Sequence, residues 1–255
     1  MKRAGRWINH PAYSLHHLFW TAVDWLYPPS CGGCQKFGER WCLDCQNSVT
    51  PVGPHVCSKC GNFTTDGGLC PNCSASLPPY QALRSWGIFI GPLREAIHKL
   101  KYHHNIGLGE ALASPLIDLF LSTQWEVDLI TPVPLSSSRL QERGYNQSAL
   151  LARPLAQLTH IQYQPKAVTR ARNTRSQVGL KARERIENVR DAFISQPDIV
   201  KNKRILLVDD VTTTGATISA CAGAMVDAGA CSVYGLTLAR SNFGLEITDP
   251  QAPRN

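Results

Sequence analysis

Cysteine spacing constrains this chain more than any other feature of its sequence. Eight of the ten cysteines fall within residues 31–73, and they form four C-x-x-C pairs: Cys31/Cys34, Cys42/Cys45, Cys57/Cys60 and Cys70/Cys73. Two thiolates three residues apart on a tight turn bind one tetrahedral metal ion from the same side, and a second pair completes a closed S₄ site. The pattern therefore predicts two structural Zn²⁺ sites with these eight cysteines as ligands.

The spacing leaves open how four pairs share two metal ions. Seven residues separate Cys34 from Cys42, and nine separate Cys60 from Cys70. Both gaps suit a zinc ribbon that is closed by a hairpin. We favour sequential sites, in which the first two pairs hold one ion and the last two pairs hold the other. The alternative is an interleaved arrangement that joins the first pair with the third.

A disulfide framework is the competing interpretation of the cysteines, and it requires an oxidising compartment. Basic residues occur at Lys2, Arg3 and Arg6, but polar residues and histidines follow where a secretory signal has an apolar core and a cleavage site. Redox activity is disfavoured because four C-x-x-C pairs follow one another outside a βαβ context. We therefore expect a cytoplasmic protein with metal-bound cysteines.

The uneven distribution of cysteines indicates two domains. The spacing of apolar residues in Leu15–Tyr27 fits a short amphipathic helix, which is too short and too polar to span a membrane. A region the size of the cysteine cluster has a marginal hydrophobic core, so bound metal would stabilise its fold. The predicted parts are the amphipathic helix segment at 1–29, a double zinc ribbon at 30–77, a larger domain at 80–240 and a C-terminal tail at 241–255.

Strand-like and helix-like stretches alternate in the larger domain. This alternation predicts an α/β fold with a mainly parallel sheet and a ligand at the carboxyl ends of its strands. We expect Cys221 and Cys231 to be buried in this domain and His98 to have a structural role. The expected strands are Leu83–Ile90, Asp128–Val133, Arg204–Val208 and Ser232–Leu238, and the expected helices are Pro92–Tyr102, Leu108–Leu121, Gln147–Leu158 and Ala216–Ala228.

Residues 205–217, ILLVDDVTTTGAT, carry the clearest functional signal. An apolar strand leads into Asp209 and Asp210, and a loop of threonines and glycine then precedes a helix. Backbone N–H groups, hydroxyls and a positive helix terminus bind phosphate, and two carboxylates accept hydrogen bonds from neighbouring hydroxyls. Ribose 5-phosphate presents both groups. A turn with an aspartate helix cap explains only one carboxylate, and no Walker loop or G-x-G-x-x-G fingerprint is present.

At these residues the chain resembles the type I phosphoribosyltransferases, whose motif for 5-phosphoribosyl 1-diphosphate (PRPP) is a strand, two acidic residues and a Thr/Gly-rich loop. With its further motifs and its leading zinc ribbons, the chain resembles the ComF competence-protein family. In some bacteria this family is also described as a group of gluconate-utilisation proteins. These motifs are LKY at 100–102, TPVPL at 131–135, RGYNQ at 143–147 and TRSQVGL at 174–180. The resemblance covers roughly residues 15–240 and implies a type I phosphoribosyltransferase-like sheet.

The resemblance also implies roles for matching positions. The residues that it implies for PRPP are Asp209, Asp210, Val211, Thr212, Thr213, Thr214, Gly215, Ala216 and Thr217, where the aspartates hold the ribose hydroxyls and the loop holds the 5-phosphate. The residues that it implies for the diphosphate are Lys101, Ser136, Ser137, Arg139, Arg143 and Arg175. Mg²⁺ suits the diphosphate because it binds phosphate oxygens and keeps several waters.

The segment 166–190 is strongly basic. It has eight Lys and Arg residues against Glu184 and Glu187, a net charge of +6 in a chain whose formal charge is +7. Because arginine forks bind phosphate oxygens in pairs, we expect this segment to form a lid over the diphosphate. A solvated face and a contact with single-stranded nucleic acid are the alternatives, although the run lacks interleaved aromatics for base stacking.

Three functions compete at this point. The first is an enzyme that transfers phosphoribose from PRPP to an acceptor, and the second is a PRPP or nucleotide sensor without turnover. The third, which the ComF resemblance implies, is an interaction protein of DNA uptake whose zinc ribbons dock a helicase or strand-handling protein. The acidic pair and the threonine loop favour the first two functions. An enzyme and a sensor would both need these residues, so they do not distinguish the two functions. The sequence does not identify the acceptor.

Overall fold

The computed structural model describes residues 28–171 and 192–241. The predicted helix at Leu15–Tyr27 and most of the basic segment lie outside the described residues. None of the described helices is long and apolar enough to cross a membrane. The elements are α2 (Leu43–Asn47), α3 (Pro71–Ala75), β1 (Ala82–Ile88), α4 (Gly91–Tyr102), α5 (Gly107–Thr123), β2 (Leu129–Pro132), α6 (Ser137–Arg143), α7 (Gln147–Thr159), β3 (Gln162–Tyr163), β4 (Val168–Arg170), β5 (Phe193–Ser195), α9 (Pro197–Val200), β6 (Arg204–Thr212), α10 (Ala216–Asp227) and β7 (Ser232–Arg240).

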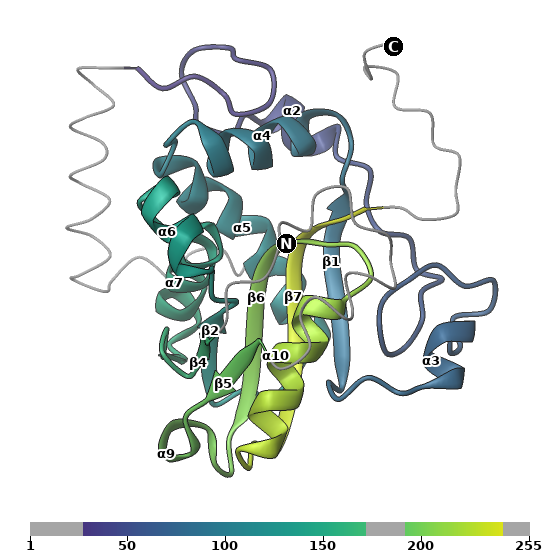
Figure 1. Cartoon of the computed structure of the whole chain (residues 1–255). Coiled ribbons are helices and arrows are strands. Elements are labelled where there is room, and N and C mark those ends of the chain that lie inside the picture. The colour runs from purple at the N-terminus through teal and green to yellow at the C-terminus, as the bar shows by residue number, and fades with distance from the viewer. Residues whose placement is uncertain (1–27, 172–191, 242–255) are drawn as a thin grey trace.

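A five-stranded sheet in the order β1-β7-β6-β2-β3 forms the centre of the molecule (Figure 1). Each of its strand pairs is parallel. The strands β4 and β5 form a separate antiparallel pair. The structure therefore confirms the predicted fold class, a mainly parallel α/β sheet preceded by a small cysteine-rich unit.

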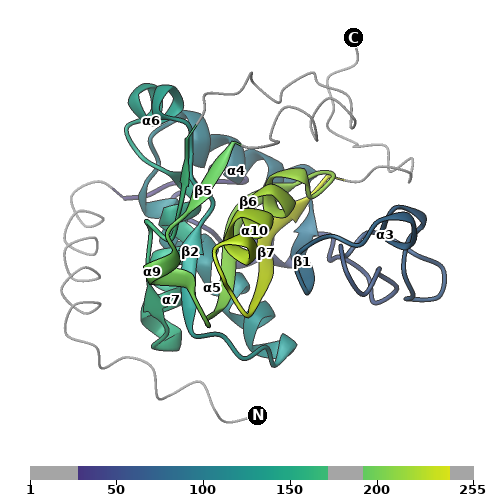
Figure 2. The same ribbon diagram turned by 60° about the horizontal axis from the view of Figure 1, so that its bottom comes forward.

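Alternate residues of β6 face opposite layers of the fold. Leu206 and Val208 belong to an apolar core that includes α4, α5 and α7, whereas Ile205 and Leu207 belong to a core that includes α10. This alternation follows from the pleat of a strand, in which successive side chains point to opposite faces. Helices therefore cover both faces of the sheet, and Figure 2 shows α10 in front of the sheet and α5 behind it.

The acidic pair lies within a strand, and this differs from the sequence prediction. The predicted strand ends at Val208, but β6 continues to Thr212 because its pairing with β7 continues to the register pair Thr212 and Arg240. Asp209 and Asp210 are therefore held by sheet hydrogen bonding. The other seven predicted helices and strands of this domain are present with ends shifted by one or two residues.

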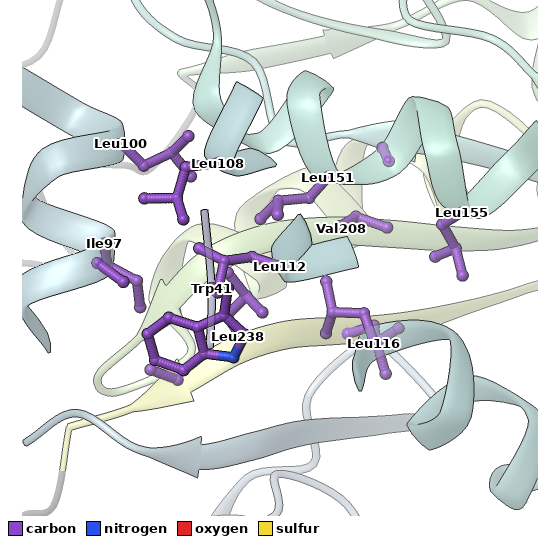
Figure 3. Close-up of a cluster of buried hydrophobic side chains, with 14 of the residues drawn as sticks. Trp41, Ile97, Leu100, Leu108, Leu112, Leu116, Leu151, Leu155, Val208 and Leu238 are labelled. Carbon is purple, nitrogen blue, oxygen red and sulfur yellow. The ribbon is translucent and has the colours of Figure 1, made fainter. Parts of the chain in front are cut away.

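The two groups of cysteines pack at different places on the sheet domain. Figure 1 shows α2 beside α4, and α3 farther out on the side of the sheet where β1 forms the edge. Cys31, Trp41 and Cys45 lie in the core with α4 and α5, and Figure 3 shows the Trp41 ring among labelled leucines of α5 and β7. The cysteines near α3 lie in the core on the α10 side. The domain bounds at 77 and 80 stay predictions, and both cores contain residues from each side of them.

The chain between the two groups of cysteines runs along the outer edge of the sheet. The backbone N–H of Ile88 donates to the carbonyl of Thr50 at 2.8 Å, and that of Leu83 donates to the carbonyl of Lys59 at 2.8 Å. These bonds connect the cysteine-rich unit to β1 at two points. The unit is therefore positioned by backbone hydrogen bonds as well as by apolar packing.

The two cysteines outside the C-x-x-C pairs differ in burial. Cys221 in α10 is fully buried, as predicted. The prediction for Cys231 is wrong, because this side chain is exposed. Cys231 precedes the first residue of β7, in a turn where its backbone N–H donates to the carbonyl of Lys203 at 2.9 Å. Apolar neighbours in the sequence predicted burial, but the residue lies just outside the strand.

Candidate functional site

Each group of cysteines brings four sulfur atoms together. The first cluster is Cys31, Cys34, Cys42 and Cys45, the second cluster is Cys57, Cys60, Cys70 and Cys73, and the sulfur atoms within each lie within 4.8 Å of one another. The Sγ atoms of Cys31 and Cys45 are 3.6 Å apart, and those of Cys34 and Cys42 are 3.7 Å apart. A tetrahedral site with Zn–S bonds of about 2.3 Å places its sulfur atoms about 3.8 Å apart. Both clusters fit Zn²⁺, and the sequential pairing is confirmed.

Backbone N–H groups favour a thiolate in each cluster. The backbone N of Cys42 lies 3.5 Å from Sγ of Cys31, and that of Cys70 lies 3.3 Å from Sγ of Cys57. Burial raises the pKa of Cys31 and Cys57, but backbone hydrogen bonds outweigh burial and bring each pKa down to about 6. The thiolate is the form of cysteine that binds metal. The local backbone therefore favours the state that would hold zinc.

A cleft of about 630 Å³ opens at the carboxyl ends of β2 and β6. Every residue from Asp209 to Thr217 lines it, together with Lys101 from α4 and Arg139 and Arg143 from α6. Parallel strands end at a common edge, and the segments that follow them form the usual ligand site of an open α/β sheet. Residues from three separate sequence motifs are thus brought together around one space.

Two of the residues predicted for the diphosphate are absent from the lining of this cleft, and a third lies outside the described residues. Ser136 and Ser137 are not among the described residues that line it. Ser136 instead caps α6, where its Oγ accepts a hydrogen bond from the backbone N–H of Arg139 at 3.4 Å. Arg175 lies outside the described residues. The roles predicted for these three residues stay predictions.

The two aspartates of the motif have different partners. Asp209 Oδ1 accepts hydrogen bonds from Ser148 Oγ at 2.7 Å and from the backbone N–H of Asp210 at 3.0 Å. Asp210 Oδ1 accepts from the backbone N–H of Val211 at 2.8 Å, and its Oδ2 lies 2.8 Å from Lys101 Nζ. Both aspartates are buried. The partners therefore fix both carboxyl groups where they line the cleft.

Asp209 titrates near neutral pH. Burial raises the pKa of its carboxyl group to about 7, and the charge of Asp210 adds to this effect. The hydrogen bond from Ser148 and the charge of Lys101 act in the opposite direction, which limits the rise in pKa. A group with this pKa exchanges a proton in the physiological range. Only its ionised form accepts hydrogen bonds at both oxygens.

A tight turn connects β6 to α10 at the cleft. Gly215 caps the helix with φ of +79°, a left-handed backbone conformation that glycine adopts at little cost. The first N–H groups of a helix lack partners within it, and its dipole is positive at this end. Thr212 Oγ1 is buried and has no hydrogen-bond partner among the described residues. An anion with several acceptor oxygens would satisfy these donors.

The structure adds cleft residues that the sequence reasoning missed. Ser148 is buried in the first turn of α7, directly after the RGYNQ motif, and this position was the available signal. His98 was expected to be structural, but it is exposed and lines the cleft. Tyr102 lies beside it with ring centroids 4.8 Å apart, and the guanidinium of Arg143 lies 5.2 Å from the centre of the Tyr102 ring. The polar face of α4 therefore forms one wall.

Two kinds of comparison describe parts of the chain. Residues 22–74 match the model of the double zinc ribbon domain. Among solved structures, adenine phosphoribosyltransferase from Thermoanaerobacter pseudethanolicus is 15% identical with a TM-score of 0.35 and covers 55% of this chain and 83% of that one. Glutamine PRPP amidotransferase from B. subtilis is 20% identical with a TM-score of 0.38 and covers 55% of this chain and 30% of that one. Identities and TM-scores this low carry no information about the substrate of this chain.

Curated relatives match most of the chain. DNA utilization protein YhgH of Escherichia coli (strain K12) is 34% identical over 207 residues, which cover 78% of this chain and 90% of the relative. Competence protein F of Haemophilus influenzae is 30% identical over 200 residues, with 74% and 80% covered. Competence protein ComFC of Bacillus subtilis is 26% identical over 215 residues, with 81% and 86% covered. The chain belongs to the ComF competence-protein family, with the double zinc ribbon and the α/β sheet that its sequence predicts.

Proposed function

We propose that this protein binds PRPP with Mg²⁺ in the cleft and transfers the phosphoribosyl group to an acceptor. One observation carries the proposal. The residues predicted for the ribose hydroxyls and the 5-phosphate, and three of those predicted for the diphosphate, line a single cleft although they come from separate segments of the sequence. A ribose that carries both a phosphate and a diphosphate requires all of these groups in one cleft.

Each part of PRPP has a chemical counterpart among these residues. The carboxylates of Asp209 and Asp210 accept hydrogen bonds from the two ribose hydroxyls. The turn at 212–217 and the positive end of α10 hold the 5-phosphate. The positive charges of Lys101 and Arg139 face the diphosphate. Mg²⁺, when bound, would neutralise part of the diphosphate charge.

Departure of diphosphate builds negative charge on the leaving group and positive charge on the ribose ring. Fixed charges that meet these developing charges lower the barrier more than groups that reorganise during the reaction. In the structure Lys101 Nζ pairs with Asp210 Oδ2. Ligand binding would exchange these partners, so that Asp210 accepts a ribose hydroxyl and the ammonium group of Lys101 turns to the diphosphate.

The biological setting of the proposal comes from the relatives, which are named for DNA utilization and competence. We propose that this protein likewise serves the uptake or use of DNA, from the cytoplasm. None of the described cysteines forms a disulfide, which suits the reducing conditions of that compartment. A helicase or strand-handling partner and a contact with single-stranded nucleic acid stay predictions.

Calorimetric titration with PRPP and Mg²⁺ tests the binding site. The double variant Asp209→Asn plus Asp210→Asn removes two acceptor charges, and we expect at least a hundredfold loss of affinity, on the order of 3 kcal/mol, for two charged hydrogen bonds. The matched control is Asp118→Asn plus Asp198→Asn, which makes the same change at two exposed positions outside the cleft. Equal affinities for both double variants would contradict the site.

Turnover separates an enzyme from a sensor with the same cleft. Diphosphate release is followed after PRPP and Mg²⁺ are mixed with a panel of nucleobases and amines. An enzyme releases diphosphate with at least one acceptor, and the rate falls in the double aspartate variant. Tight binding of PRPP without release for any member of a broad panel supports the sensor function.

A further inference from the structure

The two cysteine clusters support opposite walls of the cleft. The first cluster packs in the core of α4, the helix that carries Lys101, and Nζ of Lys99 in this helix lies 3.5 Å from the carbonyl oxygen of Cys31. The second cluster packs in the other core, with Ile218 and Ala222 of α10. These residues belong to the helix whose N-terminus forms the phosphate loop. The second cluster is therefore a structural neighbour of the loop.

Tyr80 connects the second cluster to the phosphate loop. Its side chain is buried in the same apolar core as the four cysteines of this cluster. Its hydroxyl oxygen lies 3.2 Å from the position that a Cβ atom on Gly215 would occupy. The hydroxyl group of Tyr80 thus lies next to the residue that caps α10. A displacement of the cluster would remove the surface on which this turn rests.

Arg240 provides a second, independent connection. Its Nη2 donates a hydrogen bond to the carbonyl oxygen of Cys60, and its backbone is the register partner of Thr212 across β6 and β7. The guanidinium is buried, and its Nε has no hydrogen-bond partner among the described residues. A buried cation is costly unless a negative charge compensates it. A zinc ion with four thiolates carries 2 − 4 = −2.

We propose that zinc at the second cluster controls the phosphate loop. Tyr80 and Arg240 act as positioning residues: with zinc present, they hold Gly215 and Thr212 in the arrangement that binds a phosphorylated ribose. Loss of zinc removes the charge that compensates Arg240 and the support beneath Tyr80, and affinity for the phosphate group falls. This regulation rests on the proposed function, because it requires the loop to bind phosphate.

Thermodynamic linkage gives the proposal a measurable signature. If zinc at the second cluster strengthens ligand binding, then the ligand must strengthen zinc binding at that cluster by the same factor. Couplings of this kind usually amount to about 5- to 150-fold. Among the described residues, the first cluster packs with α4 and α5 and not with the loop, so its zinc should respond much less. General stabilisation of the fold by a ligand would slow zinc loss from both clusters equally.

The experiment follows zinc release from the intact protein into a chromogenic chelator, with and without saturating ribose 5-phosphate. We expect two phases of release, one per cluster, and about a fivefold or greater slowing of one phase by the ligand, because a change in affinity appears mostly in the dissociation rate. Calorimetry with ribose 5-phosphate is run in parallel. If ribose 5-phosphate and PRPP both fail to bind, the proposed function itself fails. Binding without a selective effect on one phase overturns the present proposal alone.

Variants show which phase of zinc release belongs to the second cluster. They also distinguish a positioning role of Tyr80 and Arg240 from a general effect on folding. Arg240→Gln should accelerate only the phase that the ligand slows, and Arg240→Lys should restore most of the wild-type rate by returning the charge. Tyr80→Phe, which removes one hydroxyl, should keep two zinc ions but weaken the ligand effect. The matched control is Tyr234→Phe, since Tyr234 stacks on Trp125 with ring centroids 4.7 Å apart, outside the cleft. Equal ligand effects in both tyrosine variants would contradict the role of Tyr80.

Discussion

At the scale of single residues, the surroundings of Asp209 determine at which pH its carboxyl group is ionised. Burial and the charge of Asp210 raise the pKa of Asp209 from 3.8 to about 7. The folded protein therefore holds a proton between these pH values that the unfolded chain has released. This group contributes its full share of stability below pH 4, and the contribution is lost as pH rises through 7. The ionised form that the proposed contact with ribose requires thus appears at pH values where this group contributes less to stability.

Affinity for ribose 5-phosphate should consequently rise with pH. Between pH 6 and pH 8 the ionised fraction of a group with a pKa of about 7 increases roughly tenfold, and the affinity should follow it. Calorimetric titrations across this range measure the effect. The variant Asp209→Asn serves as the control, because it removes the titration of Asp209 and keeps every other pH dependence, including that of the ligand phosphate. Identical pH profiles for the two proteins would contradict the raised pKa.

At the scale of elements, the contact between α5 and α7 depends on a close approach of two backbones. A Cβ atom on Gly109 would lie 2.6 Å from Cβ of Leu150, which is closer than van der Waals contact. In α10, by contrast, a Cβ atom on Gly223 would meet only Pro79 Cγ at 3.9 Å. The packing therefore leaves no space for a methyl group at Gly109, whereas it leaves space for one at Gly223.

Replacing these glycines by alanine should have effects of opposite sign. Gly109→Ala should lower the free energy of unfolding by about 1–3 kcal/mol, because α5 has to move away from α7. Gly223→Ala should raise it by about 0.5–1 kcal/mol, since alanine has less backbone freedom to lose and has space here. Urea denaturation of the zinc-saturated proteins measures both values. A loss of stability in both variants would show that α10 is more tightly packed than these distances indicate.

Elements with a periodic apolar pattern could be predicted, and elements without one could not. The helix at Gln147–Thr159 buries Leu151 and Leu155 on one face, which the spacing of its leucines indicates. The helix α6 has no buried residue, so its sequence shows no such pattern. The pairing that extends β6 to Thr212 depends on β7, which is distant in the sequence. The acidic pair and the threonine loop indicated a ligand site, but Ser148 joins it only through the docking of α7 on β6.

At the scale of the whole molecule, the two cysteine clusters pack in the same two apolar cores as the sheet. Cys31 and Cys45 pack with helices of the sheet domain, and Cys57 and Cys60 pack with α10 on the other side. The sequence shows the cysteines as a separate group, because spacing carries no information on what they pack against. Metal binding energy is therefore coupled to the folding of the sheet as well as to that of the zinc ribbons.

Removal of both zinc ions should lower the melting temperature of the sheet itself. We expect a decrease of about 10 °C or more, since several kcal/mol of metal binding energy act at about 2–4 °C per kcal/mol for a chain of this size. Circular dichroism of helices and strands during heating measures it, with and without a strong chelator. Restored melting after zinc is added back is the control. A sheet transition at an unchanged temperature would show that the zinc ribbons and the sheet fold independently.

The backbone bonds between the cysteine-rich unit and β1 also protect the protein from association. An edge strand presents unpaired N–H and C=O groups that can pair with another copy of the chain. Here residues 50–59 cover β1, with Pro51 opposite Gly87, and proline has no N–H to offer a further strand. The opposite edge is β3, which has only two residues. Zinc loss would uncover the longer edge, so the metal-free protein should be prone to aggregation through strand pairing.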